Sequence, residues 1–207
     1  FAPPEPGAVE ELRRELGLPG DATVVMHLSN LKPLKRPLDL VASARAALQR
    51  EPRLAWVVVG DGVLRAEMEA ACRREGVAER FRFVGWVDRD AVPDYLNLAD
   101  IVAMPSAAEA RSLVCLEAQA CGVPVVAGRR PGVAAIVEDG VTGRLTPPGD
   151  TAAFAAAVGA LLDDPAGRAA MGRRARAHAR ERHGLASAAR ALDALLARVT
   201  APREAAR

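Results

Sequence analysis

The sequence predicts a doubly wound α/β fold, in which helices cover both faces of one parallel sheet. Short and continuously apolar runs alternate with helical segments of roughly ten to fifteen residues, which is typical of a parallel sheet buried on both faces. The chain has 207 residues, of which 50% are hydrophobic. That length suffices for one large domain with a sizeable core, and we expect a sheet of about six strands.

The predicted strands are short, apolar and rich in β-branched residues. The first ends at the turn-prone pair Ser29-Asn30, and the second ends at Gly60-Asp61-Gly62. The sixth is a weaker candidate than the others. In chain order the predicted strands are residues 24–28, 54–59, 81–84, 101–104, 123–127 and 143–145.

The predicted helices take their ends from proline, glycine and capping residues. Pro37 fits the first turn of a helix, Gly76 ends one, and Asp88 stands where an N-cap belongs. The C-terminal part is helical, with breaks near Pro165 and Gly184. The predicted helices are residues 38–49, 63–75, 88–98, 113–121, 132–138 and the region from 150 onward.

The composition excludes several classes of protein. Basic and acidic residues number 28 and 26, so the formal net charge of +2 does not suit a protein that seeks polyanions. Aromatic residues make up 3% of the chain, which leaves few stacking platforms for single-stranded nucleic acid. No apolar run approaches the roughly 20 residues of a membrane span, and no signal segment opens the chain.

Two features of the sequence concern the length of the complete polypeptide and the compartment in which it occurs. Phe1 is followed by a proline-rich linker, so we expect a piece of a longer polypeptide that lacks its N-terminal half. The three cysteines have no CxxC spacing, which favours a reducing compartment. We expect a cytoplasmic protein, and peripheral attachment to a membrane through the absent half stays open.

Ligands of doubly wound sheets bind outside the carboxyl ends of the strands, which directs attention to four loops, residues 29–36, 60–62, 105–113 and 128–132. The first loop carries Lys32 and Lys35, the chain's two lysines, and Arg36. Cations beside a helix N-terminus suit a diphosphate. The loop lacks the glycines of a Walker sequence. A solvated basic turn is the alternative.

Glu109 and Glu117 are the second feature with a chemical interpretation. Eight residues separate them, roughly 12 Å in a continuous helix, which is too far for a shared proton or metal. Carboxylates accept hydrogen bonds from sugar hydroxyls. The pair therefore suits the two ends of a nucleotide sugar, with the hexose at one glutamate, the ribose at the other and the diphosphate between them. A solvated helix residue is the alternative for Glu117.

Other motifs are less specific. Gly60-Asp61-Gly62 permits a close backbone approach to a ligand but does not extend to a dinucleotide fingerprint. Asp88-Arg89-Asp90 matches a metal-binding DxD pattern, and we interpret it as a helix cap instead. The histidines at 27, 178 and 183 are scattered. We expect neither a metal site nor a cofactor.

Taken together, these motifs resemble the C-terminal, donor-binding half of retaining GT-B glycosyltransferases of the large group 1 family, from residue 1 to about Pro148. The resemblance implies a Rossmann-like sheet and an absent N-terminal acceptor domain. The residues that carry it are Lys35, Gly60-Asp61-Gly62, Ala99-Asp100, Pro105-Ser106, Glu109, the run from Glu117 to Val126, and Asp139-Gly140-Val141-Thr142-Gly143.

The resemblance also implies roles for individual residues. Lys35 would bind the donor diphosphate, Glu109 would hold hydroxyls of the transferred sugar, and Glu117 would hold the ribose. Backbone N–H groups at Ser112 and Leu113 would face the phosphate and the sugar. The loop at Trp86 and Val87 would lie beside the base, and Gly60 and Gly62 would allow close approach.

Three departures from the family pattern concern this site. Asn30 stands where the family has an arginine, and Lys32 or Arg36 could replace that cation. Arg111-Ser112 replaces a Phe-Gly pair, and residue 135 is alanine instead of glutamate. The first loop is similar to that of N-acetylglucosaminyl-malate synthases, which favours UDP-N-acetylglucosamine as donor.

The resemblance implies hexosyl transfer with retention and without a metal, in a parent enzyme whose isolated half is inactive. Glu109 and Lys35 are the predicted catalytic residues. We expect a nucleoside diphosphate sugar and an unknown acceptor as partners, and no nucleic acid. A non-catalytic nucleotide-binding or assembly module with a decayed sugar site is the alternative.

Overall fold

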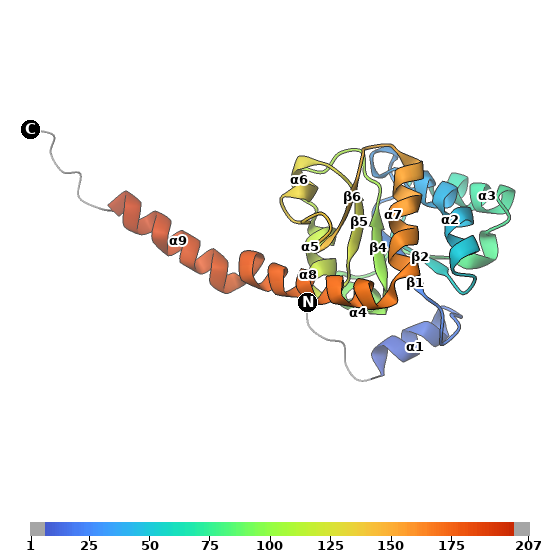
Figure 1. Ribbon diagram of the computed structural model, residues 1–207, viewed down its shortest axis with the longest axis horizontal. Coiled ribbons are helices and arrows are strands. Elements are labelled where there is room, and N and C mark those ends of the chain that lie inside the picture. Colours follow the sequence, from blue (N-terminus) through green and yellow to red (C-terminus); the bar gives the residue numbers. More distant parts are fainter. Residues whose placement is uncertain (1–6, 201–207) are drawn as a thin grey trace, which may run out of the picture.

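Six parallel strands form one sheet in the computed structural model, which describes residues 7–200. The strand order is β3-β2-β1-β4-β5-β6 (Figure 1). Each predicted strand is confirmed to within two residues at its ends, whereas the predicted linker at residues 1–6 lies outside the described residues. The strands are β1 Val24–Leu28, β2 Ala55–Val59, β3 Phe81–Gly85, β4 Ile101–Met104, β5 Val125–Gly128 and β6 Gly143–Thr146.

The order of the strands reverses between β1 and β4, which pair directly in the centre of the sheet. Val25 is paired with Ile101 and Met26 with Val102. The chain leaves β1 toward β2 on one side and leaves β4 toward β5 on the other side. Loops that diverge from neighbouring strands in this way leave a crevice at their carboxyl ends.

The sheet is buried on both faces because each strand contributes side chains to two separate apolar layers. Val24 and Met26 belong to one layer, whereas Val25 between them belongs to the other. All of these side chains are fully buried. On the second layer, Trp56 stacks on Phe81 with 5.7 Å between the ring centroids.

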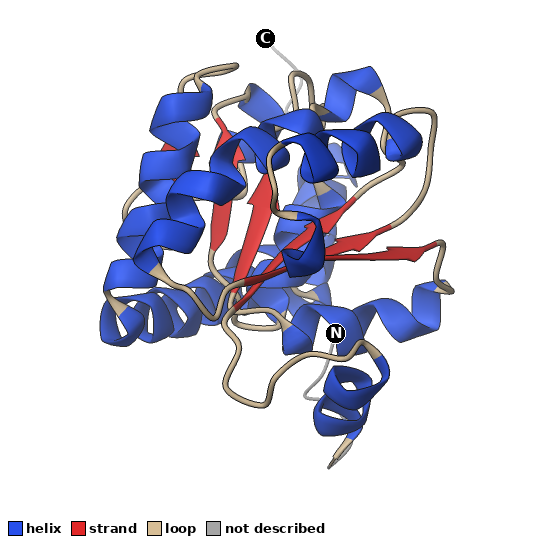
Figure 2. Cartoon of the chain, turned by 90° about the vertical axis from the view of Figure 1, so that its right-hand side faces the viewer, coloured by secondary structure: helices blue, strands red, loops and turns tan. Residues whose placement is uncertain are grey.

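Helices cover the two faces (Figure 2). On one face lie α2 Leu38–Arg50, α3 Arg65–Arg74 and α7 Thr151–Asp163, and on the other face lie α1 Ala8–Glu15, α4 Val92–Leu98, α5 Leu113–Ala120 and α6 Pro131–Ala134. The long helix α8 Pro165–His183 packs against both α7 and α5, and α9 Leu185–Thr200 extends away from the sheet (Figure 1). No helix of the described residues is long and apolar enough to cross a bilayer.

Two predicted helices differ from the structure. The helix expected at 88–98 is a 3₁₀ turn, Arg89–Ala91, followed by α4. Asp88 stands at the N-cap position of this turn, as predicted, but its side chain makes no capping hydrogen bond. Pro93, which lacks an N–H group, lies in the first turn of α4 and sets the start of that helix.

The helix expected at 132–138 is the four-residue α6. The helix ends at Ala135, its C-cap, and the carbonyl of Ile136 beyond it accepts a hydrogen bond from the side chain of Gln119, at 3.2 Å. Ile136 and Val137 are both buried. Both side chains belong to the apolar layer that α5 and α6 form with the sheet, so the chain packs into that layer where the predicted helix would have continued.

Candidate functional site

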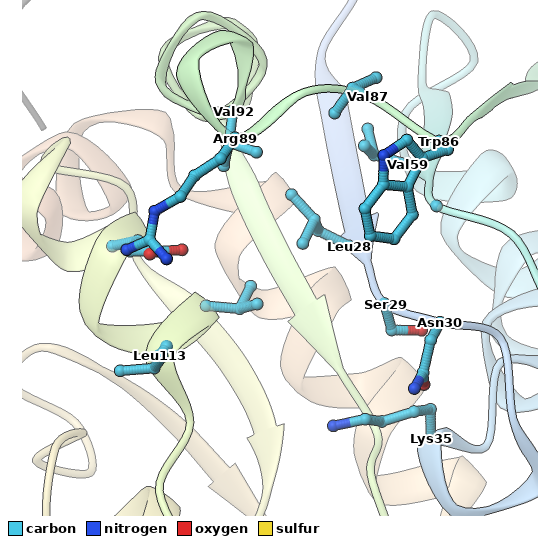
Figure 3. A pocket seen from close by; sticks show the side chains of 13 residues that line it. Leu28, Ser29, Asn30, Lys35, Val59, Trp86, Val87, Arg89, Val92 and Leu113 are labelled. Atoms are coloured by element: carbon cyan, nitrogen blue, oxygen red, sulfur yellow. The ribbon is translucent and has the colours of Figure 1, made fainter.

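A cavity of about 500 Å³ opens at the carboxyl ends of the central strands. Its walls are mostly apolar, and its polar groups gather at two ends (Figure 3). This combination of apolar walls and few polar groups is typical of small-molecule sites. The lining residues are Leu28, Ser29, Asn30, Lys35, Val59, Gly60, Trp86, Val87, Arg89, Val92, Leu113, Val114 and Glu117.

One polar end of the cavity belongs to the loop after β1. Figure 3 shows Asn30 and Lys35 together on this side. Arg36, which sequence reasoning placed with them, does not line the cavity. Its backbone is left-handed, with φ of 50°, and its guanidinium pairs with the carboxylate of Asp39 at 2.7 and 3.1 Å. Lys35 is therefore the loop cation that faces the cavity.

Lys35 forms an ion pair with Glu109, which belongs to the loop after β4. The side chains are 23% and 10% exposed, so both charges are largely removed from water. A second contact joins the same loops, because the N–H of Ala107 donates to the carbonyl of Leu34 at 2.7 Å. Glu109 does not line the cavity itself, and its carboxylate reaches the cavity edge only through Lys35.

The loop that carries Glu109 packs tightly on the first turn of α6. A Cβ atom on Gly132 would lie 2.1 Å from the carbonyl oxygen of Ala110 and 2.4 Å from that of Glu109. Any side chain at position 132 would therefore displace this loop. The close contact at Gly132 therefore depends on the absence of a side chain there. Residue 135, where the family has a glutamate, is an exposed alanine.

Helix α5 begins beside the cavity. Ser112 is its N-cap and accepts a hydrogen bond from the backbone N–H of Cys115 at 3.4 Å. Ser112 is buried and does not line the cavity, whereas Leu113 lines it and is 55% exposed. The amide groups in the first turn of a helix have no intrahelical partners and carry a positive potential. The start of α5 therefore offers an environment that favours an anion.

The other polar end of the cavity contains Glu117 and Arg89. Glu117 is half-buried on α5, and burial raises the pKa of its carboxyl while the charge of Arg89 lowers it. Figure 3 shows the Arg89 side chain reaching from its 3₁₀ turn toward α5. Sequence reasoning missed Arg89, because it lies inside the Asp88-Arg89-Asp90 motif that we interpreted as a cap.

Trp86 and Val87 form the rim of the cavity between these two ends. Trp86 is 80% exposed, which is unusual for a side chain of this size. Its indole stands at the edge of the cavity in Figure 3. A flat aromatic surface in this place can stack on a planar ring.

The two glycines of the loop after β2 bring neighbouring loops together. A Cβ atom on Gly60 would lie 1.9 Å from the carbonyl oxygen of Ser29, and one on Gly62 would lie 2.2 Å from that of Asn30. Gly60, with φ of 108°, lines the cavity, and Gly62 does not. We expected these glycines to permit a close backbone approach to a ligand. In the structure, the backbone that approaches them closely is the loop after β1.

Within residues 7–200, no three His, Cys, Asp or Glu side chains gather in a group that could hold a metal ion. Asp88 and Asp90 are exposed and lie outside the set that lines the cavity.

Comparison with known proteins identifies the family. The model of the glycosyl transferases group 1 family matches residues 8–178. The chain is 40% identical over 197 residues to a D-inositol 3-phosphate glycosyltransferase of Catenulispora acidiphila, covering 91% of this chain and 46% of that protein. It is 38% identical over 176 residues to a GDP-mannose-dependent alpha-(1-6)-phosphatidylinositol monomannoside mannosyltransferase of Mycolicibacterium smegmatis, covering 82% and 46%.

Solved structures agree with this family. HepE of Anabaena, crystallised with UDP, superposes with a TM-score of 0.84 at 30% identity, over 94% of this chain and 54% of that one. The same protein crystallised with UDP-glucose gives a TM-score of 0.83 at 29% identity, with 94% and 54% covered. The C-terminal domain of a group 1 glycosyl transferase from Francisella tularensis shares the fold, with a TM-score of 0.75 at 19% identity, over 88% of this chain and 95% of that domain.

The chain spans about half the length of the curated relatives it matches. Its six-stranded parallel sheet has the α/β, Rossmann-like architecture of its GT-B structural neighbours. The family match and the fold both cover most of the described residues, and the chain therefore belongs to the group 1 glycosyl transferases.

Proposed function

We propose that this chain is the donor-binding domain of a retaining glycosyltransferase, and that its cavity takes a nucleoside diphosphate sugar. The observation that carries the proposal is the cavity itself, which has the Lys35–Glu109 pair at one end and Glu117 at the other. An elongated ligand with a negative centre and hydroxyl groups toward both ends matches this arrangement.

In this proposal each part of the donor meets a group of suitable chemistry. The diphosphate lies between Lys35 and the start of α5, where the ammonium and the helix N-terminus both favour negative charge. The ribose hydroxyls donate to Glu117, and the base lies against Trp86 and Val87. The hexose lies toward Glu109, at the loop that packs on Gly132.

The reaction breaks the bond between the anomeric carbon and the diphosphate oxygen. The acceptor hydroxyl attacks from the face that the leaving group vacates, and its proton passes to the departing diphosphate oxygen. Negative charge develops on the diphosphate as this bond breaks. Lys35 and the first turn of α5 stabilise that charge, which lowers the barrier because the interaction strengthens in the transition state. Glu109 orients the sugar, and the acceptor is held by a domain outside this chain.

We propose a UDP-sugar as the donor, with UDP-N-acetylglucosamine as the first candidate. HepE, which is 30% identical, was crystallised with UDP, and the first loop is similar to that of N-acetylglucosaminyl-malate synthases. The relative named as GDP-mannose-dependent makes GDP the nucleotide to test against UDP.

Calorimetric titration of the isolated chain with UDP, ADP and GDP tests the proposal. We expect binding of at least one nucleoside diphosphate, with UDP the tightest, and no sugar transfer by the isolated chain. Failure to bind any of the three would refute the donor site. In the longer parent protein, transfer that is lost in Glu109→Gln supports the enzyme, whereas nucleotide binding without transfer favours a non-catalytic module.

A further inference from the structure

We propose that His27 and Ser29 form a hydrogen-bonded relay that holds the backbone of the loop after β1 in its phosphate-binding conformation. His27 and Ser29 are then positioning residues of the diphosphate subsite. This inference rests on the proposed function, because it assigns the loop with Asn30 and Lys35 to the diphosphate. The relay connects β4, β1 and the cavity edge.

The relay begins inside the sheet. His27 lies on β1 and is fully buried, and its Nδ1 is 2.8 Å from the carbonyl oxygen of Ala103 on the neighbouring strand β4. A carbonyl oxygen can only accept, so Nδ1 carries the proton and donates. In the neutral ring Nε2 must then accept, and the hydroxyl of Ser29, at 2.7 Å, donates to it.

The ring stays neutral because of where it lies. The pKa of His27 is lowered to about 4. Burial is the largest cause, the hydrogen bond to Ala103 opposes it, and the positive charge of Lys35 adds to it. At neutral pH the imidazole therefore has one proton, and that proton is committed to Ala103. The direction of each hydrogen bond in the relay is fixed as a result.

Ser29 connects the side chain of His27 to the backbone of the loop. Its Oγ donates to His27 and also accepts a hydrogen bond from the N–H of Leu31 at 3.2 Å. A serine side chain that bonds the N–H two residues later stabilises a turn. Leu31 has φ of 35°, a conformation that is unfavourable for residues other than glycine and that must be held by its surroundings.

The loop after β2 holds the same turn from its other side. The N–H of Ser29 donates to the carbonyl of Val59 at 3.0 Å, and the N–H of Leu64 donates to the carbonyl of Leu31 at 3.1 Å. Gly60 and Gly62 allow the two backbones to approach this closely. The relay is thus one half of a clamp on residues 29–31.

The position of the clamp connects it with ligand binding. Ser29 and Asn30 line the cavity on the same side as Lys35 (Figure 3). From Leu31 the chain needs only one 3₁₀ turn, Pro33–Lys35, to place the ammonium at the cavity. A change in the turn at 29–31 would therefore shift Asn30 and Lys35 together, and it would leave the nucleoside end near Glu117 unchanged.

Two measurements test the relay, with Ser29→Ala and Ser43→Ala as a matched pair. Ser43 is fully buried, and its hydroxyl donates to the carbonyl of Asp39 at 2.7 Å on α2, away from the cavity. The first measurement is amide hydrogen exchange of the ligand-free chain. We expect faster exchange at Leu31 in Ser29→Ala but not in Ser43→Ala, and unchanged exchange at Leu31 in Ser29→Ala would overturn the relay.

The second measurement compares UDP with UMP by calorimetry. In Ser29→Ala we expect the affinity for UDP to fall about fivefold to tenfold, the effect of one lost hydrogen bond, with less than a twofold change for UMP. Equal losses for both nucleotides, or a loss in Ser43→Ala as well, would overturn the positioning role. If the wild-type chain binds no nucleoside diphosphate, the proposed function fails, whereas the exchange result still decides whether the relay exists.

Substitutions of His27 separate the two halves of the relay. His27→Gln keeps an acceptor where Nε2 stands, and His27→Asn keeps a donor where Nδ1 stands. Because Ser29 needs the acceptor, we expect His27→Gln to retain more of the preference for UDP over UMP than His27→Asn. The reverse order would contradict the direction of the hydrogen bonds.

Discussion

Lys35 and Glu109 neutralise each other across the two loops that diverge from the centre of the sheet, although 74 residues separate them in the sequence. One follows β1 and the other follows β4, the pair of strands at which the strand order reverses. In the proposed complex the ammonium faces the diphosphate and the carboxylate faces the sugar. A donor that enters the cavity therefore competes with an ion pair already in place.

This competition predicts opposite effects for the two partners. Glu109→Gln releases Lys35 from its carboxylate, so the affinity for UDP is expected to rise about twofold to fivefold, because a partly buried ion pair no longer has to be opened. Lys35→Ala removes the phosphate cation, and we expect a loss of at least about tenfold. Calorimetry with UDP measures both effects.

Exposed Glu67 on α3 provides the matched control for Glu109→Gln. Glu67→Gln makes the same change of charge outside the cavity and should leave the affinity for UDP unchanged. A rise in both variants would show a general effect of net charge. A fall in Glu109→Gln would mean that the carboxylate contributes to UDP binding itself.

Much of the fold could be predicted from the sequence because buried parallel strands are apolar over their whole length. The same reasoning located the loops at the carboxyl ends. Besides Lys35, six of the predicted site residues line the cavity, namely Asn30, Gly60, Trp86, Val87, Leu113 and Glu117. These residues stand next to strand ends, where position follows directly from the order of the elements.

The remaining features depend on contacts between loops, which local patterns do not encode. His27 interrupts an apolar run only once, so nothing in the sequence distinguishes a relay from an ordinary buried histidine. Arg36 was predicted to face the ligand, but it pairs with Asp39 three residues later. That spacing was visible in the sequence, and it would have been the signal that this arginine has a local partner.

Gly132 gives a prediction about the sugar end of the site. In Gly132→Ala the new methyl group would collide with the carbonyl oxygens of Ala110 and Glu109, so the loop must move. We expect a loss of about 1–3 kcal/mol in the free energy of unfolding. We also expect weaker binding of a UDP-sugar relative to UDP, because the displaced loop carries Glu109. Denaturant unfolding and calorimetry measure these two effects.

Gly20→Ala is the control for this substitution. A Cβ atom on Gly20 meets no other atom within 4 Å, and its backbone is not left-handed. Its stability should stay within about 0.5 kcal/mol of the wild type. If Gly132→Ala unfolds at the same denaturant concentration as Gly20→Ala, the Glu109 loop can move away from α6 without a cost in stability, which contradicts the prediction.

Trp86 gives a prediction about the nucleoside end. Its 80% exposure means that Trp86→Ala removes little buried area, so stability should hardly change. Loss of a stacking surface is expected to lower the affinity for UDP by about fivefold or more. Val63→Ala is the control, because Val63 is 78% exposed in another loop.

Fluorescence tests the same contact without a substitution. The chain has two tryptophans, and Trp56 is fully buried. Quenching by acrylamide therefore reports on Trp86. UDP should protect the exposed indole from the quencher. Unchanged quenching at saturating UDP would show that the base lies elsewhere.

The pKa of His27 predicts how stability depends on pH. Its value is lowered from 6.5 to about 4, first because of burial. Between these two pH values the unfolded chain binds a proton that the folded chain does not bind, so the free energy of unfolding falls as the pH falls. The contribution is fully present above pH 6.5, and roughly 3 kcal/mol of it is lost by pH 4.

Urea unfolding of the wild type and of His27→Gln at pH 7.5, 6 and 4.5 measures this slope. His27→Gln has no group that titrates at this position, so its stability should fall less steeply over the interval, whatever its stability at pH 7.5. His183→Gln is the matched control: the pKa of His183 is also lowered, by burial first and then by the charge of Arg111, but this side chain is only partly buried. Its removal should change the slope much less. Equal slopes for the wild type and His27→Gln would mean that His27 takes up its proton at the same pH in the folded and the unfolded chain, so that the sheet does not hold it neutral.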